Sequence, residues 1–306
     1  MLPVVFRRRH PMHIDIKSEP RIRSWIIFDI ESAVIDETGH RRYQQMERYV
    51  PRDDDDDQPG RRSYKRAEDP LRTPRWIFQS ITTACAMVLT EHSDGNADVS
   101  RFVTMSAPDH TEKEIVAGLL QVLADAPADT DLVSWAGSFH DLPMLVCAAM
   151  RHGLTLPNNW KWLAFGGDGR QRHVDFARVA TANMKMKPIH ESELLAAFDI
   201  PSKLSAPAFA VARLIESGQW DMVQEQCEGD VIATALLLCR WRKLHDPRVD
   251  ADMAEDRILR RVCELRAGRG YIAALEARRA ARFAAQYDKA ANDAARLAPW
   301  LEQDAA

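Results

Sequence analysis

Two acidic residues, Asp29 and Glu31, lie at the end of a short apolar run that begins at Trp25. A run of this length and composition is typical of a buried strand. Alternate side chains of a strand project from one face, so the two acids are predicted to point the same way. Neighbouring carboxylates repel each other and are costly to desolvate, and bound cations offset both effects. The pattern fits a metal site, but also two solvated acids before a turn.

Two more acids lie where elements of secondary structure are predicted to begin or to pack. Asp141 follows an apolar strand at 132–135 and falls in the first turn of a helix predicted over 140–152. An acid is also common there because it caps the helix and interacts with the helix dipole. Asp230 lies in a long helix predicted over 220–244. On its apolar face an acid needs a partner, whereas on its outer face it would be solvated.

The elements that must position these acids alternate along the chain. Three strands are followed by a helix, a strand, a helix, a strand and then helices, which predicts an α/β fold with a mixed sheet flanked by helices and a C-terminal helical extension. The strands are predicted at 25–28, 81–90, 102–106, 132–135 and 172–179. The helices are predicted behind a capping box at Thr111 and at 140–152, 191–198, 208–215, 220–244, 250–267 and 271–304.

The predicted organisation has a loose basic N-terminal arm, a main domain and a helical extension. These cover residues 1–23, 24–245 and 246–306, and a charged, disordered insertion is expected within the main domain at about 51–74. The chain has 306 residues, of which 46% are apolar, enough for one substantial core. Its formal net charge is −4, so a nucleic-acid partner would have to meet a local concentration of basic residues.

The composition also favours an intracellular protein without a membrane span. The five cysteines form no C-x-x-C pair, which predicts buried thiols in a reducing compartment. No apolar stretch reaches the roughly 18 residues of a transmembrane helix, and no signal peptide is evident. We therefore expect a cytoplasmic protein.

Five short segments are more informative in combination than any one of them alone. They read D-I-E at 29–31, A-G-S-F-H-D-L-P at 136–143, H-V-D at 173–175, F-D-I-P-S-K at 198–203 and Q-C-E-G-D-V-I-A-T at 226–234. In this order they resemble the motifs of the DEDD superfamily of 3′–5′ exonucleases, with the DnaQ-like version of the ribonuclease H fold. The nearest resemblance is to the group related to the proofreading domains of family B DNA polymerases. There the corresponding patterns are D-x-E, N-G-x-x-F-D-L-P, H-x-D, L-G-I-P-x-K and Y-C-E-x-D-V-x-x-T.

The resemblance implies hydrolysis of nucleic acid from a 3′ end with two Mg²⁺ ions about 3.5–4 Å apart, for which Mn²⁺ could substitute. It implies that Asp29 bridges both ions, that Glu31 and Asp230 bind the ion that holds the attacking water, and that Asp141 serves the other. Lys203 would approach a substrate phosphate, unless it is a solvated turn residue. The expected substrate is a single strand or a 3′ end, DNA in preference to RNA, although an RNA-directed enzyme is the alternative.

The sequence departs from the family pattern around the attacking water. Gln226 and Glu225 occupy the positions at which the family has a Tyr or a His, and glutamine can orient a water but cannot take its proton near neutral pH. Ala136 replaces an Asn and His140 replaces a Phe in the second motif. His140 could substitute as the base, or be a partly exposed residue of the first helical turn. A nucleic-acid-binding module with weakened catalysis is therefore the competing interpretation.

The C-terminal extension is rich in arginine and alanine. Its arginines could line a polyanion, or form a solvated helix face with pairs between successive turns. An apolar stripe in 271–304 could also pack on a partner helix. The arginines concerned are Arg257, Arg260, Arg261, Arg266, Arg269, Arg278, Arg279 and Arg282.

Overall fold

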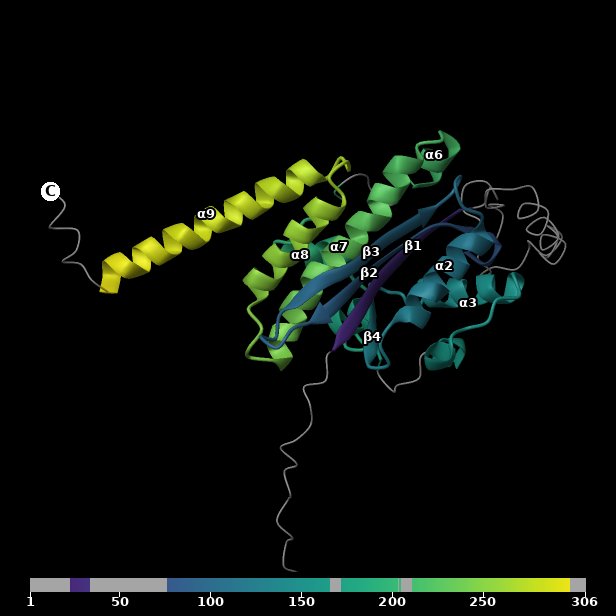
Figure 1. Ribbon diagram of the computed structural model, residues 1–306, viewed down its shortest axis with the longest axis horizontal. Helices are drawn as coiled ribbons and strands as arrows, with labels where there is room; N and C mark the ends of the chain where they lie inside the picture. The colour runs from purple at the N-terminus through teal and green to yellow at the C-terminus, as the bar shows by residue number, and fades with distance from the viewer. Residues whose placement is uncertain (1–22, 34–75, 166–171, 203, 205–210, 298–306) are drawn as a thin grey trace, which may run out of the picture.

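A mixed five-stranded sheet forms the centre of the computed structural model, which describes residues 23–33, 76–165, 172–202, 204 and 211–297 (Figure 1). The expected basic arm up to residue 22 and the insertion at 51–74 lie outside these residues. The strand order is β3-β2-β1-β4-β5; β2 is antiparallel to β1 and β3, whereas β4 is parallel to β1 and β5. The strands are β1 (Ser24–Ala33), β2 (Ser80–Glu91), β3 (Ala97–Ser106), β4 (Thr130–Ser134) and β5 (His173–Asp175).

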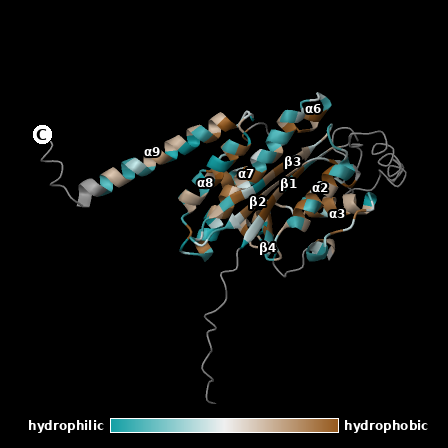
Figure 2. Cartoon of the chain, in the orientation of Figure 1, coloured by the Kyte–Doolittle hydropathy of each residue, from teal (hydrophilic) through white to brown (hydrophobic). Residues whose placement is uncertain are grey.

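Helices cover both faces of this sheet, as the sequence predicts (Figure 1). Trp25 and Ile27 of β1 are buried on one face, whereas Ile26, Phe28 and Ile30 are buried on the other. Figure 2 shows the apolar residues gathered along the sheet and the helix surfaces that face it. The first face is covered by α7 (Trp220–His245) and α8 (Ala251–Leu265), and the second by α2 (Glu112–Asp125), α3 (Asp141–Arg151) and the 3₁₀ helix η3 (Asn158–Phe165).

The last described helix, α9 (Ile272–Leu297), contacts the rest of the protein through its first half. Ile272 and Leu275 are buried in the core, but Phe283 and Tyr287 are exposed where the helix extends away from the body (Figure 1). None of the described helices is both long and apolar enough to span a membrane. The remaining short elements are η2 (Trp76–Phe78), α4 (Phe176–Ala180), α5 (Glu191–Ala197) and α6 (Val211–Glu216).

Local sequence signals explain most element boundaries, with one clear exception. Thr111 and Glu114 form the predicted capping box at the start of α2. The strand predicted over 172–179 is wrong after Asp175, because the Asp175 carboxylate accepts a hydrogen bond from the Ala177 amide at 3.0 Å and caps α4. The sequence also did not predict η3. All five cysteines are free thiols, and three of them are buried.

Candidate active site

Asp29 and Glu31 extend from the second half of β1 on the face that α7 covers. They occupy the same alternate positions as the buried Ile27, and Ile30 between them packs on the opposite face. The predicted alternation of the strand is therefore confirmed. Both acids are only partly buried, and the α7 helix lies close enough for the Cys227 thiol to donate a hydrogen bond to the Asp29 carbonyl at 3.4 Å.

Asp230 reaches this position from α7. Asp29, Glu31 and Asp230 each offer a carboxylate oxygen, and these atoms all lie within 4.8 Å of one another. Gln226, one helical turn earlier, donates from Nε2 to Asp230 Oδ2 at 2.7 Å. Because residues four apart share a face of a helix, Gln226 is placed to hold the orientation of the Asp230 carboxylate. Two distant segments thus converge on one group of three acids.

Asp141 arrives at the same edge of the sheet by a different route. Because β4 is parallel to β1, the two strands end at the same edge, and the chain turns after Ser134 into α3. Gly137 permits that turn, since a Cβ atom there would lie 2.3 Å from Ser134 Oγ and 3.4 Å from Asp141 Oδ2. Asp141 is 5% exposed and lies beside the group of three without being part of it.

The electrostatic environment of Asp29 and Asp141 disfavours their ionised forms. Burial raises the pKa of Asp29 well above its ordinary value, and the negative charges of Glu31, Asp141, Asp230 and Glu191 raise it further. Burial also raises the pKa of Asp141, although its hydrogen bond with the neighbouring His140 acts in the opposite direction. A divalent cation would reverse both penalties, and clustered carboxylate oxygens are the ligands that Mg²⁺ and Mn²⁺ prefer. The donor set therefore fits a hard metal ion.

A comparison with protein families identifies the family of this chain. A family described as a predicted 3′–5′ exonuclease related to the exonuclease domain of PolB matches residues 74–272. The chain belongs to this family. The match includes Asp141 and Asp230 but begins after Asp29 and Glu31, and the mixed sheet between helices is the ribonuclease H-like fold of this exonuclease family. No curated protein matches the chain.

Solved structures of DNA polymerase and exonuclease I are also similar to the chain. The family B DNA polymerase of Pyrobaculum calidifontis has 15% identity and a TM-score of 0.42, covering 79% of this chain and 29% of the polymerase. E. coli exonuclease I with a dT13 oligonucleotide has 12% identity and a TM-score of 0.33, covering 74% of this chain and 42% of that one. With a dA16 oligonucleotide the values are 13%, 0.35, 79% and 45%. The chain spans less than half the length of each of these proteins.

The departures from the PolB-related exonuclease pattern include two positions with unusual backbone conformation. Ala136 stands where the family pattern has Asn, and its φ is 54°. Asp199 stands at the Gly of the L-G-I-P pattern, and its φ is 53°. Gly and Asn adopt this left-handed conformation at little cost, whereas Ala does not. At both positions this chain thus holds a residue with a Cβ atom in the left-handed conformation, which Asp tolerates better than Ala does.

Asp175 is a structural residue whose importance the sequence did not indicate. It is buried and accepts hydrogen bonds from three backbone amides, those of Ala136, Ser138 and Ala177, at 2.9–3.0 Å. Two of these amides belong to the turn that carries Asp141. Asp175 of β5 thereby fixes the turn that carries Asp141 against the edge of the sheet.

The two histidines near the site have different surroundings. His173 contacts the hydroxyls of Ser134 and Ser138 at 2.8 and 3.4 Å, and burial lowers its pKa to about 4. The side chain of His140 is 45% exposed, and its Nδ1 lies 3.0 Å from Asp141 Oδ1. This hydrogen bond raises the pKa of His140. His140 is therefore close to the acids, but one of its nitrogens is already engaged.

Another acid near the site, Glu191, was not predicted from the sequence. It is 7% exposed at the start of α5, its Oε1 lies 3.3 Å from Thr234 Oγ1, and its charge contributes to the raised pKa of Asp29. An acid in the first turn of a helix is so common that the sequence offers no signal for this one. Lys203, the expected phosphate ligand, lies outside the described residues.

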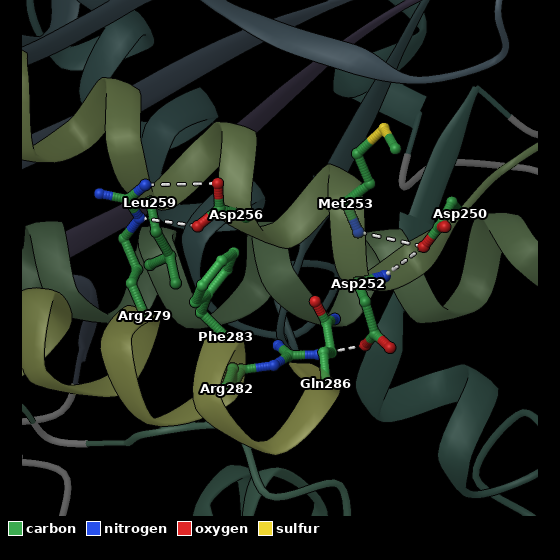
Figure 3. Close-up of a pocket in the computed structure, with 9 residues that line it drawn as sticks. All are labelled: Asp250, Asp252, Met253, Asp256, Leu259, Arg279, Arg282, Phe283 and Gln286. Atoms are coloured by element: carbon green, nitrogen blue, oxygen red, sulfur yellow. Dashed lines mark hydrogen bonds and ion pairs between the residues drawn. The ribbon is translucent and has the colours of Figure 1, made fainter. Parts of the chain in front are cut away.

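Most of the arginines that could line a polyanion surface form ion pairs within the protein. Figure 3 shows Arg279 and Arg282 of α9 reaching Asp256 and Asp252 of α8. The same arginine, Arg282, also contacts Glu255, which is fully buried. These pairs join the two helices of the hairpin. The solvated-face interpretation therefore describes this surface only in part, because the pairs are mostly between helices.

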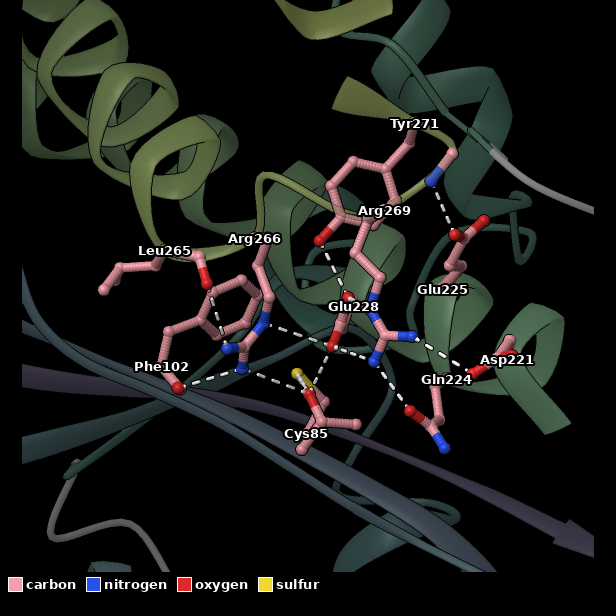
Figure 4. A network of polar contacts seen from close by, with 12 residues as sticks. Cys85, Phe102, Asp221, Gln224, Glu225, Glu228, Leu265, Arg266, Arg269 and Tyr271 are labelled. Carbon is pink, nitrogen blue, oxygen red and sulfur yellow. Dashed lines mark hydrogen bonds and ion pairs between the residues drawn. The ribbon is translucent and has the colours of Figure 1, made fainter. Parts of the chain in front are cut away.

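Arg266 and Arg269 have a different role, because they neutralise the buried Glu228 of α7 (Figure 4). The Glu228 carboxylate is 0% exposed and also accepts hydrogen bonds from Tyr271 at 2.7 Å and Thr104 at 2.6 Å. Burial and the adjacent Glu228 raise the pKa of the Tyr271 hydroxyl, so it remains a donor. This network fastens the turn between α8 and α9 to the helix that carries Asp230.

Proposed function

We propose that the chain is a divalent-metal-dependent 3′–5′ exonuclease that degrades single-stranded nucleic acid, DNA in preference to RNA. The observation that carries this proposal is the convergence of Asp29, Glu31 and Asp230 within 4.8 Å, in a member of the PolB-related exonuclease family. These three acids, with Asp141 beside them, would hold two Mg²⁺ ions, or Mn²⁺ in their place. When bound, the ions would supply charge stabilisation to the phosphodiester under attack.

The other residues of the site have positioning roles in this proposal. Gln226 holds Asp230 through its Nε2, while its Oε1 is buried and meets no hydrogen-bond donor among the described residues. That oxygen can accept a hydrogen bond from the attacking water and so orient it, without taking its proton. His140 is fixed by Asp141 through Nδ1, which leaves Nε2 to receive the proton. His140 is thus the better placed of the two for general-base chemistry.

A direct test uses single strands of one sequence, as DNA and as RNA, that carry a label at the 5′ end. With Mg²⁺ or Mn²⁺ the unaltered protein should shorten the DNA strand stepwise from its 3′ end, and the RNA strand more slowly. Asp29→Asn should lower the rate by at least about a hundredfold, since it removes a charge from the metal ligand set. Glu264→Gln, an exposed carboxylate of α8, serves as the matched control and should cleave normally.

The outcome also separates the competing interpretation, a binding module with weakened catalysis. Gln226 motivates that alternative, because glutamine cannot act as a base. Strand binding without metal-dependent shortening would support the module. Shortening that persists in chelator or in the Asp29→Asn protein would remove the metal centre from the mechanism. A roughly hundredfold loss in His140→Ala would identify the proton acceptor.

A further inference from the structure

A groove follows the outer edge of β5, beside the acids but outside them. Its volume is about 710 Å³. One end is lined by Ser138 and Asp175, next to the turn that leads into Asp141, and the other end by Arg23 and Arg172. Because β5 is the edge strand of the described sheet, its outer side is open to a ligand. The groove therefore leads away from the catalytic edge along the sheet.

Positive charge is concentrated in this groove, although the whole chain carries a net charge of −4. Four cationic side chains line it, against two carboxylates, and Asp175 is already occupied by backbone amides. Among the described residues none of the four cations forms an ion pair, in contrast to the paired arginines between α8 and α9. The four are Arg23, Arg172, Arg178 and Lys185.

The groove also offers flat and apolar surfaces next to these charges. Trp241 of α7 forms part of its wall. The Arg178 guanidinium lies 6.0 Å from the centre of the Phe139 ring. Phe139 is 50% exposed in the turn that leads into Asp141. Surfaces that bind single strands without regard to sequence combine a cationic groove for the backbone with aromatic rings on which bases stack. This groove has both components.

The segment that carries Lys185 is held in a defined shape. Ala182, Asn183 and Met184 all have positive φ, and the chain is closed by a hydrogen bond from the Met186 amide to the Thr181 carbonyl at 3.0 Å. Such strain is sustained only where surrounding contacts enforce it, and it is frequent at ligand-binding sites. Here it presents Lys185 to the groove and leaves Met184 and Met186 exposed beside it.

We propose that this groove along β5 binds the single strand that leads away from the catalytic acids, with Arg178 and Lys185 contacting its phosphates. The inference rests on the proposed exonuclease function, because a strand whose end lies at Asp29 and Asp141 must leave the acids along some cationic path. The arginines of the hairpin are less available for that path, because among the described side chains acids of the protein already pair with all of them except Arg260. The rings of Phe139 and Trp241 favour bases over the side chains of an acidic peptide.

The experiment measures binding of a 5′-fluorescein-labelled dT15 strand in chelator, where no cleavage occurs. Lys185→Gln and Arg178→Gln should each weaken binding about threefold to tenfold at moderate salt. Each should also reduce the slope of log K against log salt by about 0.7, the value for one phosphate contact on a single strand. Lys113→Gln, an exposed lysine on α2, is the matched control and should leave affinity and slope unchanged.

A second substrate separates the groove from the catalytic centre. Thymidine 5′-(4-nitrophenyl phosphate) is too short to follow β5, so its cleavage by the unaltered protein with Mn²⁺ tests the acids alone. Failure of that cleavage, with strand binding that depends on Lys185, would refute the exonuclease and leave the groove standing. Unchanged affinity and slope in both groove variants would overturn the groove proposal. If a poly-glutamate peptide bound as tightly as the strand, and both groove variants lost the same affinity for it, the assignment to nucleic acid would be overturned.

Discussion

Glu228 and Asp230 lie two residues apart on α7 and therefore on nearly opposite faces of the helix. Glu228 is fully buried, and the protein supplies its counter-charges and donors through Arg266, Arg269 and Tyr271. Asp230 instead joins Asp29, whose pKa is shifted by burial and by four other carboxylates. On one face of α7 the protein's own residues thus neutralise a buried acid, whereas on the other face the acids repel one another, and bound cations would offset that repulsion. The first arrangement serves folding, and the second has the features of a functional site.

The largest expected effect is at Glu228, on the face of α7 where the protein neutralises its own acid. Glu228→Gln leaves two arginines partly buried without their carboxylate, and breaking a buried ion pair from one side costs about 3–5 kcal/mol. We expect the free energy of unfolding, measured by urea denaturation, to fall by about 3 kcal/mol. Glu264→Gln, which removes an exposed pair with Arg261, should change it by less than about 0.5 kcal/mol. Equal stability of the two variants would show that the network in Figure 4 does not hold the hairpin.

Asp29→Asn should raise the free energy of unfolding, in contrast to Glu228→Gln. Removing one charge from a group of like charges relieves their repulsion. In chelator the free energy of unfolding of the variant should therefore be about 1 kcal/mol higher than that of the unaltered chain. Addition of Mg²⁺ should raise the melting temperature of the unaltered protein, because a ligand that binds only the folded state stabilises it. The variant should lose that response, whereas Asp109→Asn on the surface should retain it. A less stable Asp29→Asn protein in chelator would contradict this account of the acids.

The same acids give the direction of a pH dependence. The pKa values of Asp29 and Asp141 are raised in the folded protein, so between the ordinary and the raised values the folded state binds more protons than the unfolded one. Stability in chelator should therefore fall as pH rises through this window, by at most about 1.4 kcal/mol per pH unit for each proton. Asp29→Asn should flatten this dependence. Urea denaturation at a series of pH values measures it.

The sequence predicts the acid-bearing face of β1 because alternation in a strand is a local property. Asp29 and Glu31 must point together wherever β1 lies, and a parallel β4 must bring Asp141 to the same edge of the sheet. The family pattern adds Asp230, which helix periodicity alone leaves undecided between a buried and a solvated position. The fold class could be predicted for the same reason, since the order of apolar strands and amphipathic helices determines how they can be layered.

What the sequence does not reveal depends on contacts between distant segments. Nothing local distinguishes Arg269, which neutralises Glu228, from an arginine that would bind a polyanion. Glu191 has the appearance of an ordinary acid in a first helical turn, and only the packing of α5 against α7 brings it near Asp29. Asp175 was predicted to lie within a longer strand, because a helix cap cannot be recognised before the direction of the following chain is known.

The smallest expected effect lies in the turn that precedes Asp141. Ala136 has a φ of 54°, where a residue with a Cβ atom is strained by roughly 1–2 kcal/mol, so Ala136→Gly should gain up to about 1 kcal/mol in the free energy of unfolding. Ala136→Asn should gain less, since Asn tolerates this conformation only better than Ala does. Ala277→Gly in α9 is the opposite-sign control, because glycine costs a helix about 0.5–1 kcal/mol. A loss of stability in Ala136→Gly would mean that the turn before Asp141 stores no strain.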